Sequence, residues 1–189
     1  DDDYDTKLIV AANYDDLSAA ANQDLSSTSN YIAILGLVDV DALADYMIMN
    51  FYIGNTDWAH HNWYVTRNRV DPAGLWRYHS WDPEHCMKWF EQNVVTKDNG
   101  DGSPTDLHRD LRRNDDYKLL FSDHVHRHFF NNGVLTPAQV RELYQYRLDL
   151  LDRAVVAESV RWGDNTRSTP YTREVEWITE RNRIWNEYF

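Results

Sequence analysis

Apolar residues recur with helical spacing after Val38, in the run DVDALADYMIMNFYIGN. One face of this predicted helix carries four large apolar side chains, namely Leu43, Tyr46, Met47 and Phe51. Asp39 or Asp41 can cap its start, and Gly54 can end it. The first thirty residues are polar and rich in Ala, Ser and Asn. They show a helical signal only in NYDDLSAAANQ and are otherwise left unassigned.

Two segments rich in aromatic and β-branched residues flank the turn sequence DPAG at 71–74. They predict a β-hairpin with strands at about 62–69 and 75–82. The polar stretch TKDNGDGSPTD at 96–106 is predicted to be a loop. A helix is expected to follow it, from a cap at Asn114 to a stop at Gly133.

The most regular pattern in the chain begins at Thr136, which can cap a long helix that ends at Gly163. Pro137 occupies the first helical position, and Gln139 would complete a capping box. The apolar face of this helix is predicted to contain Leu143, Tyr146, Leu150, Leu151, Ala154 and Val155. A last helix is expected in STPYTREVEWITERNRIWNEYF, with Trp177, Ile178 and Trp185 on one face. The pattern therefore predicts a mainly α fold with a small β-hairpin, in a single domain over 1–189.

The composition is that of a folded, acidic protein. Of the 189 residues, 42% are hydrophobic and the formal net charge is -12. Such a charge repels nucleic-acid backbones and favours cations, so we expect no nucleic-acid partner. No apolar run approaches the ~20 residues of a membrane span, and we expect none. The opening DDDYDTK has no signal-peptide pattern, and a mature, processed or fragment start all agree with it.

The stretch GNTDWAHHNWY at 54–64 concentrates polar groups between the predicted helix and the first strand. Because a hairpin returns the chain, Asp82 and Glu84 at the end of the second strand should lie near Asp57 and Asn62. Carboxylates and a carboxamide suit Mg²⁺ or Ca²⁺. They are also the groups used in phosphoryl transfer, where one Asp orients a hydroxyl while an Asn and a second Asp hold metals. The alternative is a loop stabilised by its own Asp and Asn side chains.

A D-x-x-x-x-N pattern, then a hairpin, then an Asp is typical of the protein-kinase catalytic loop. The run LADYMIMNFYIGNTDWAHHNWYVTRNR, with GLWRYHSWDPE after it, resembles the CotH family, named for a spore-coat protein and similar to atypical secreted kinases. LLFSDHVHRHFFNNGVLTPAQV and ESVRWGD resemble its downstream region, so the resemblance covers roughly 30–189. It implies a kinase-like fold that uses ATP with Mg²⁺ or Mn²⁺ to phosphorylate Ser or Thr of secreted or surface proteins. By position, Asp57 would be catalytic, and Asn62 and Asp82 would bind metal and nucleotide. Many relatives carry a second Asp where Glu84 stands, so the resemblance leaves the metal ligand after the hairpin as either Asp82 or Glu84.

Two features depart from the kinase pattern. Lys7 is the only lysine before Asp57, and no Gly-rich loop precedes it. WDPEHC also lacks the Gly that follows the metal-binding Asp in kinases. The resemblance is therefore to a kinase C-terminal lobe, and other domains of the same polypeptide would have to supply the N-terminal lobe.

Two functions follow from these expectations. The first is an extracellular or cell-surface protein kinase, in agreement with an acidic, Lys-poor, Trp-rich chain of a secreted bacterial protein. The alternative is a non-catalytic, pseudokinase-like binding module of a larger surface assembly.

Two pairs of histidines each leave two interpretations open. His60 and His61 would be substrate contacts or exposed polar residues, and His124 with His128 would be a transition-metal pair or a plain helix face.

Overall fold

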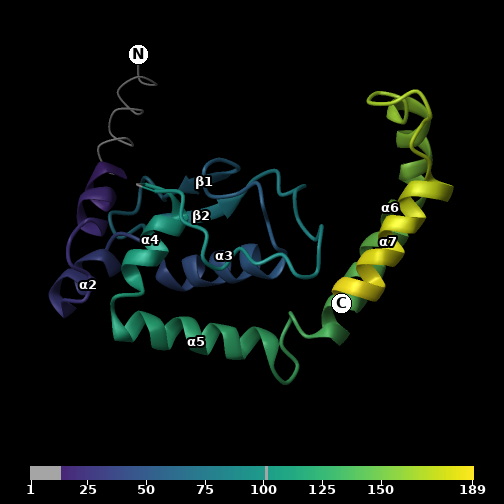
Figure 1. The fold of residues 1–189 in the computed structure, drawn as a ribbon. Helices are drawn as coiled ribbons and strands as arrows, with labels where there is room; N and C mark the ends of the chain where they lie inside the picture. The colour runs from purple at the N-terminus through teal and green to yellow at the C-terminus, as the bar shows by residue number, and fades with distance from the viewer. Residues whose placement is uncertain (1–13, 101) are drawn as a thin grey trace, which may run out of the picture. The chain divides into compact units, whose positions relative to one another are not determined.

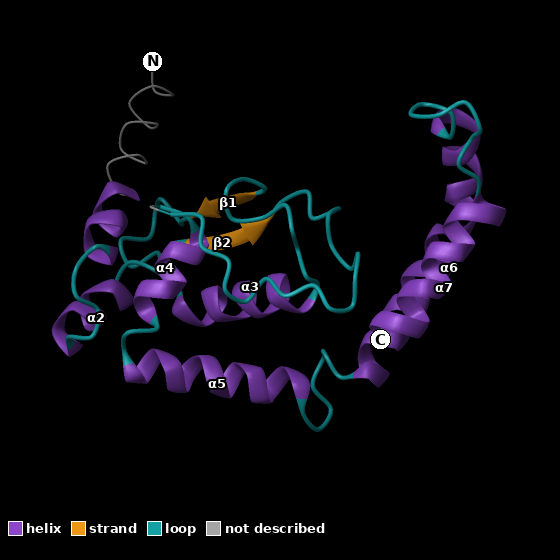
Figure 2. Ribbon diagram, viewed as in Figure 1, coloured by secondary structure: helices purple, strands orange, loops and turns teal. Residues whose placement is uncertain are grey.

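The computed structural model describes residues 14–100 and 102–189, so Lys7 and most of the unassigned N-terminal segment lie outside the described residues. The chain forms two compact units. The first contains the described residues up to Lys88 and those of Gln92–Val125, and the second contains Trp89–Glu91 and His126–Phe189. The structure is 54% helical with one two-stranded hairpin, which confirms the predicted mainly α fold (Figures 1 and 2).

Helix α3, Val40–Tyr52, is the central helix of the first unit. The predicted cap is confirmed, because the Asp39 side chain accepts a hydrogen bond from the backbone N–H of Ala42 at 2.9 Å. Gly54 adopts a positive φ of 56° just after the helix end, a conformation that glycine takes without steric cost. The predicted N-terminal helix is present at 14–21. Helix α2, Thr28–Leu35, was not predicted.

The predicted hairpin is present but shorter than expected. Strand β1, Trp63–Thr66, pairs antiparallel with β2, Arg77–Ser80, and Trp63 lies opposite Ser80. The β2 strand contacts α3. This pairing brings the chain after Ser80 back to the segment that precedes Trp63, as the sequence predicted.

Aromatic side chains from α3, the hairpin and the loop between them form much of the core of the first unit. Trp58 is fully buried, and its Nε1–H donates to the hydroxyl of Tyr46 at 2.5 Å. Tyr78 from β2 packs against Tyr46 with ring centroids 6.0 Å apart. The loop that carries Asp57 is therefore anchored on a packed aromatic cluster.

The prediction of a loop over 96–106 is wrong for its last three residues, because helix α4, Pro104–Leu111, begins there. Its cap is Ser103, whose Oγ accepts from the backbone N–H of Asp106 at 3.1 Å. Helix α5, Asp115–Phe129, starts after Asn114 as predicted, and ends before Gly133.

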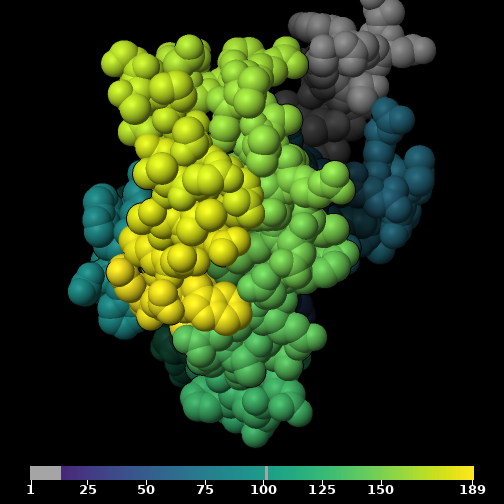
Figure 3. Space-filling model, turned by 90° about the vertical axis from the view of Figure 1, so that its right-hand side faces the viewer, coloured from purple at the N-terminus to yellow at the C-terminus, as the bar shows by residue number. Residues whose placement is uncertain are grey.

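The second unit contains helix α6, Pro137–Trp162, and a C-terminal helical segment. That segment consists of the π-helical turn η1, Arg173–Trp177, helix α7, Ile178–Arg183, and the π-helical turn η2, Ile184–Tyr188. The segment lies alongside α6 (Figures 1 and 3). The predicted last helix is thus present, with a π-helical turn at each end.

Two details of the α6 prediction are wrong. Thr136 caps no helical N–H, because its hydroxyl donates to the carbonyl of Gly133 at 2.8 Å. The buried side chains of α6 are Val140 and Leu148. By contrast, Leu143, Tyr146, Leu150 and Leu151 of the predicted apolar face are exposed. Tyr144, one turn from Val140 and Leu148, packs against Phe189 with ring centroids 5.1 Å apart, so the packed stripe follows i, i+4 spacing. Within the described residues, no helix has the length and apolar character needed to cross a membrane.

Candidate active site and metal centre

The loop between α3 and β1 carries Asp57 and is tied to α3 by two buried asparagines. Asn55 is 1% exposed and its Oδ1 accepts from the backbone N–H of Asp57 at 3.1 Å. The Asn55 Nδ2 donates to Oδ1 of Asn50 at 3.0 Å. Asn50 in turn donates to the carbonyl of Tyr46, one turn earlier in α3, at 2.9 Å. These bonds hold the backbone of Asp57 in one position relative to the helix.

Asp57 and Asn62 lie side by side. The Asn62 Nδ2 donates to the backbone carbonyl of Asp57 at 3.1 Å and to its carboxylate Oδ2 at 3.0 Å. Both N–H bonds of the carboxamide are thereby directed at Asp57. The side-chain oxygen of Asn62, Oδ1, is left available as a hard-cation ligand.

The hairpin brings the segment after β2 to the same place. The backbone N–H of Trp81 donates to the carbonyl of Asn62 at 3.0 Å, and Asp82 is the next residue. Glu84 and His85 offer ligand atoms that lie, with one from Asp57, within 4.8 Å of one another. The structure therefore brings Asp57, Asn62 and Glu84 together. The Asp82 side chain is exposed, and no hydrogen bond or ion pair in the part of the chain that the structure describes joins it to Asp57, Asn62 or Glu84.

Four residues around this site have a positive backbone φ although they are not glycine. They are Ala59 at 77°, Asn62 at 59°, Asp82 at 49° and Met87 at 52°. Asn and Asp adopt this conformation more readily than most residues, whereas Ala and Met rarely do. Strained backbone of this kind gathers at functional sites, where the surrounding structure holds it in place.

Three histidines surround the Asp57 carboxylate. The Nε2 atoms of His61 and His60 lie 2.8 Å and 3.5 Å from Oδ1 of Asp57. His85 approaches the other oxygen, with Nε2 4.0 Å from Oδ2. His60 and His61 were expected either as substrate contacts or as exposed polar residues, and both are half exposed beside Asp57.

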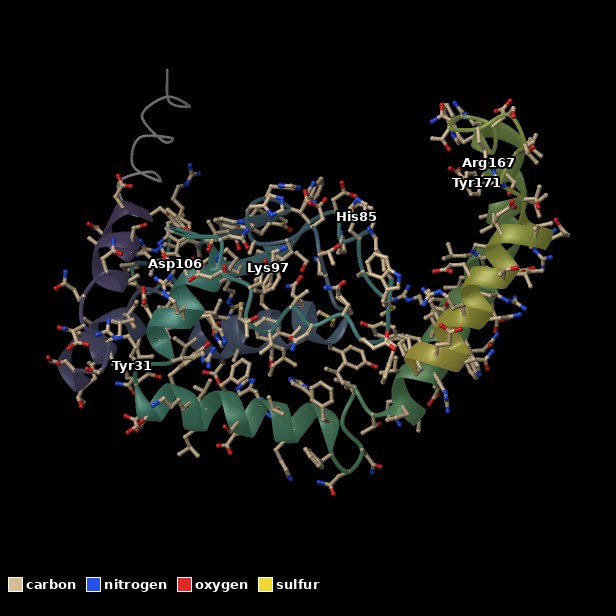
Figure 4. The ribbon with its side chains drawn as sticks, in the orientation of Figure 1. Tyr31, His85, Lys97, Asp106, Arg167 and Tyr171 are labelled. Atoms are coloured by element: carbon tan, nitrogen blue, oxygen red, sulfur yellow. The ribbon has the colours of Figure 1, made fainter. Side chains whose placement is uncertain are left out.

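Lys97 lies close to Asp57, which the sequence did not predict. Its Nζ donates to the carbonyl of Thr56 at 2.6 Å, next to Asp57 in the chain. Burial lowers the pKa of Lys97, and the negative charge of Asp57 opposes that shift. Lys97 and His85 both come from the long loop between β2 and α4 (Figure 4). The one available signal was scarcity, because the chain holds only four lysines.

His124 lies outside this site and has a packing role in the first unit. The side chain is 2% exposed, with Nδ1 2.6 Å from Oδ1 of Asp45 and Nε2 3.0 Å from Oδ1 of Asp41. It therefore links α5 to α3 through two carboxylates.

Taken together, a helix, a hairpin and a loop bring carboxylates, a carboxamide and imidazole rings to one site. The chain matches the family described as CotH kinase protein over residues 5–184, and it belongs to that family. The resemblance identified in the sequence is thereby confirmed. No curated protein and no solved structure matches the chain significantly.

Proposed function

We propose that this chain carries the catalytic loop of an extracellular or cell-surface protein kinase. It would transfer the terminal phosphoryl group of ATP to a Ser or Thr hydroxyl of a secreted or surface protein. The observation that carries the proposal is the double hydrogen bond from Asn62 to Asp57. These bonds fix the carboxylate of Asp57 next to the side-chain oxygen of Asn62, Oδ1, which is free to bind a cation. Membership of the CotH kinase family supports the same reaction class.

Asp57 would orient the acceptor hydroxyl and take its proton. Its side chain is 25% exposed, so a substrate hydroxyl can reach it. One of its oxygens, Oδ2, is held by Asn62, and the hydroxyl would approach Oδ1, where it would replace the ring of His61 that lies 2.8 Å away. A carboxylate held in this way has a defined direction for proton transfer, which geometry-dependent acid–base catalysis requires.

Asn62, Asp82 and Glu84 would hold the divalent cation. All three offer oxygen ligands, which Mg²⁺ and Mn²⁺ prefer. When bound, the metal–ATP complex supplies the phosphoryl group and neutralises its charge. Asp82 and Asn62 both have a positive φ, at 49° and 59°, an uncommon backbone conformation of the kind that gathers at functional sites.

Lys97 would contact a phosphate oxygen beside the acceptor hydroxyl. Its ammonium group is held near Asp57 by the Thr56 carbonyl, and it is partly withdrawn from water. A cation in such a place stabilises charge that spreads over the equatorial oxygens in the transition state.

A second candidate function is a non-catalytic module of a larger surface assembly. It is favoured by one observation: the described residues contain a single two-stranded sheet, with no β-rich lobe to cover the phosphates. The two candidates differ in whether ATP and metal bind together at Asp82.

Thermal unfolding with and without ATP and Mg²⁺ or Mn²⁺ tests the proposal, on the wild type and on Asp82→Ala. Ligand binding to the folded state adds about 2.7 kcal/mol at a hundredfold excess over Kd, which raises Tm by several degrees. We expect this metal-dependent rise in the wild type and in the control Asp123→Ala, an exposed residue of α5, but not in Asp82→Ala. A wild type whose Tm does not respond would favour the non-catalytic module.

A further inference from the structure

Two consecutive histidines direct the same ring atom at one carboxylate oxygen. Nε2 of His61 lies 2.8 Å and Nε2 of His60 3.5 Å from Oδ1 of Asp57. The two imidazole rings stand nearly perpendicular, with centroids 3.8 Å apart. The phosphoryl-transfer roles proposed above use neither ring, so the pair calls for a separate explanation.

The two oxygens of Asp57 have different surroundings. Oδ2 accepts a hydrogen bond from Asn62, whereas Oδ1 faces the histidines. Carboxylates that bind a metal through one oxygen are commonly held by a hydrogen bond from a neighbouring group. Asn62 therefore supplies to Asp57 the kind of support that a metal ligand receives.

The ring of His60 is oriented in the way that metal-binding histidines usually are. Its Nδ1 lies 3.4 Å from the backbone carbonyl of Trp58, to which it can donate. A histidine that donates through Nδ1 presents a lone pair at Nε2. That lone pair then faces Oδ1 of Asp57, which is also an electron-pair donor. A cation between the two atoms turns this repulsive contact into two favourable ones.

The dimensions also agree with a metal site. One ligand atom each from Asp57, His60 and His61 lies within 4.8 Å of the other two. In a tetrahedral zinc site with bonds of 2.0–2.1 Å, neighbouring ligand atoms are about 3.3 Å apart. The two distances to Oδ1, 2.8 Å and 3.5 Å, lie on either side of that value.

We propose that Asp57, His60 and His61 form a binding site for a transition-metal ion of the Zn²⁺ class. Imidazole nitrogen suits Zn²⁺, Cu²⁺ and Ni²⁺, whereas Mg²⁺ prefers oxygen. The site therefore differs in chemistry from the oxygen-donor site formed by Asn62, Asp82 and Glu84. With three protein ligands, a fourth position is open to water or another ligand.

His85 would lie outside the first coordination shell. Its Nδ1 is in contact with the Lys88 ammonium group. Its Nε2 lies 3.4 Å from Oε1 of Glu84 and 4.0 Å from Oδ2 of Asp57, on the side of the carboxylate away from Oδ1. His85 is thus a partner for the carboxylates rather than a third imidazole ligand.

A consequence of this site would be inhibition, and that consequence rests on the proposed kinase function. A metal ion on Oδ1 occupies the atom that would otherwise accept the hydroxyl proton. Zn²⁺ would then lower phosphoryl transfer even when Mg²⁺ and ATP are in excess. The binding of Zn²⁺ itself does not depend on any activity.

Calorimetric titration of the chain with ZnCl₂, without nucleotide, tests the proposal. We expect one tight site per chain, weakened at least about 100-fold in the His60→Ala/His61→Ala double variant, since even outer-shell partners contribute 10–100-fold. The control is His126→Ala, an exposed histidine of α5 stacked on Phe130, which should bind as the wild type does. Equal affinity in the double variant and the wild type would overturn the proposal, as would the absence of tight binding by the wild type.

Cobalt substitution provides a second readout. Co²⁺ in a four-coordinate site with nitrogen and oxygen ligands gives visible absorption bands, which we expect for the wild type and not for His61→Gln. Circular dichroism would verify that each variant is folded, as expected because His60 and His61 are 45% and 51% exposed. If zinc binds but no phosphoryl transfer is found, the kinase proposal fails and the metal site stands. If transfer occurs but zinc does not bind, only the metal site fails.

Discussion

Asn55 donates a hydrogen bond to Asn50 at 3.0 Å, and both side chains are fully buried. Buried carboxamides are stable only when they have hydrogen-bond partners. Here the partners form a chain from the Tyr46 carbonyl through both asparagines to the backbone N–H of Asp57. The position of the proposed catalytic residue is thus set by the interior of the first unit as well as by its own loop.

Replacing Asn55 by Ala should destabilise the protein and misplace Asp57. The change leaves Oδ1 of Asn50 and the N–H of Asp57 without their present partners, at a cost of about 1–3 kcal/mol. Urea unfolding followed by fluorescence measures the loss. Asn132→Ala, at an exposed position, serves as the control. A loss of unfolding free energy no larger than that of the control would show that the buried chain of hydrogen bonds does not stabilise the fold.

Replacing Lys97 by Met should lower kcat/KM for phosphoryl transfer, on the order of 10²-fold, because it removes a cation placed to stabilise the transferred group. The fold should persist, since Lys97 makes its contact through one terminal atom with the Thr56 carbonyl. Lys118→Met is the matched control, because Lys118 pairs with the exposed Asp115 on α5. Steady-state kinetics of the two variants in the full-length natural protein would measure kcat/KM. Equal values for Lys97→Met and Lys118→Met would contradict a role of Lys97 in phosphoryl transfer.

His108 should make the stability of the protein depend on pH. It is 5% exposed, and burial, with a contribution from the charge of Arg112, lowers its pKa from 6.5 to about 4. The unfolded chain binds a proton at this residue below pH 6.5, whereas the folded chain does so only near pH 4. Stability should therefore be retained above pH 6.5 and fall as pH decreases toward 4, by up to about 3 kcal/mol from this group.

The variant His108→Phe isolates this contribution. It removes the titrating ring and also the hydrogen bond to Tyr117, 2.8 Å away, which costs about 1 kcal/mol at every pH. Above pH 6.5 the wild type should be the more stable by about 1 kcal/mol, and toward pH 4 this difference should vanish and then reverse in favour of the variant, because only the wild type loses up to about 3 kcal/mol. A constant difference over this range would contradict the assigned pKa.

The sequence predicted those parts of the structure that depend on neighbouring residues. Asp39 caps α3 because the cap is local, and Asn62 reaches Asp57 across five positions. Glu84 was expected near them because a two-stranded hairpin can only return the chain. Each of these relationships follows from chain geometry over short distances.

Other parts depend on contacts that local patterns do not reveal. Helix α4 has one i, i+4 apolar pair, Leu107 and Leu111, and it also buries polar residues such as Thr105 and Asp106, so its apolar pattern is short. A second local signal was Ser103 followed by Pro104, a typical helix start. Lys97 reaches Thr56 from forty-one positions away, and only the packed fold shows that contact.

The most direct test of the account is phosphoryl transfer from γ-labelled ATP by the full-length natural protein and its Asp57→Asn variant, in the presence of Mg²⁺ or Mn²⁺. Asparagine keeps the shape of the side chain and removes its charge and basicity. We expect the wild type to label Ser or Thr and the variant to lose at least about 10²-fold in rate, with an unchanged unfolding curve. Undiminished labelling by a folded Asp57→Asn protein would contradict the role assigned to Asp57 and the site built around it.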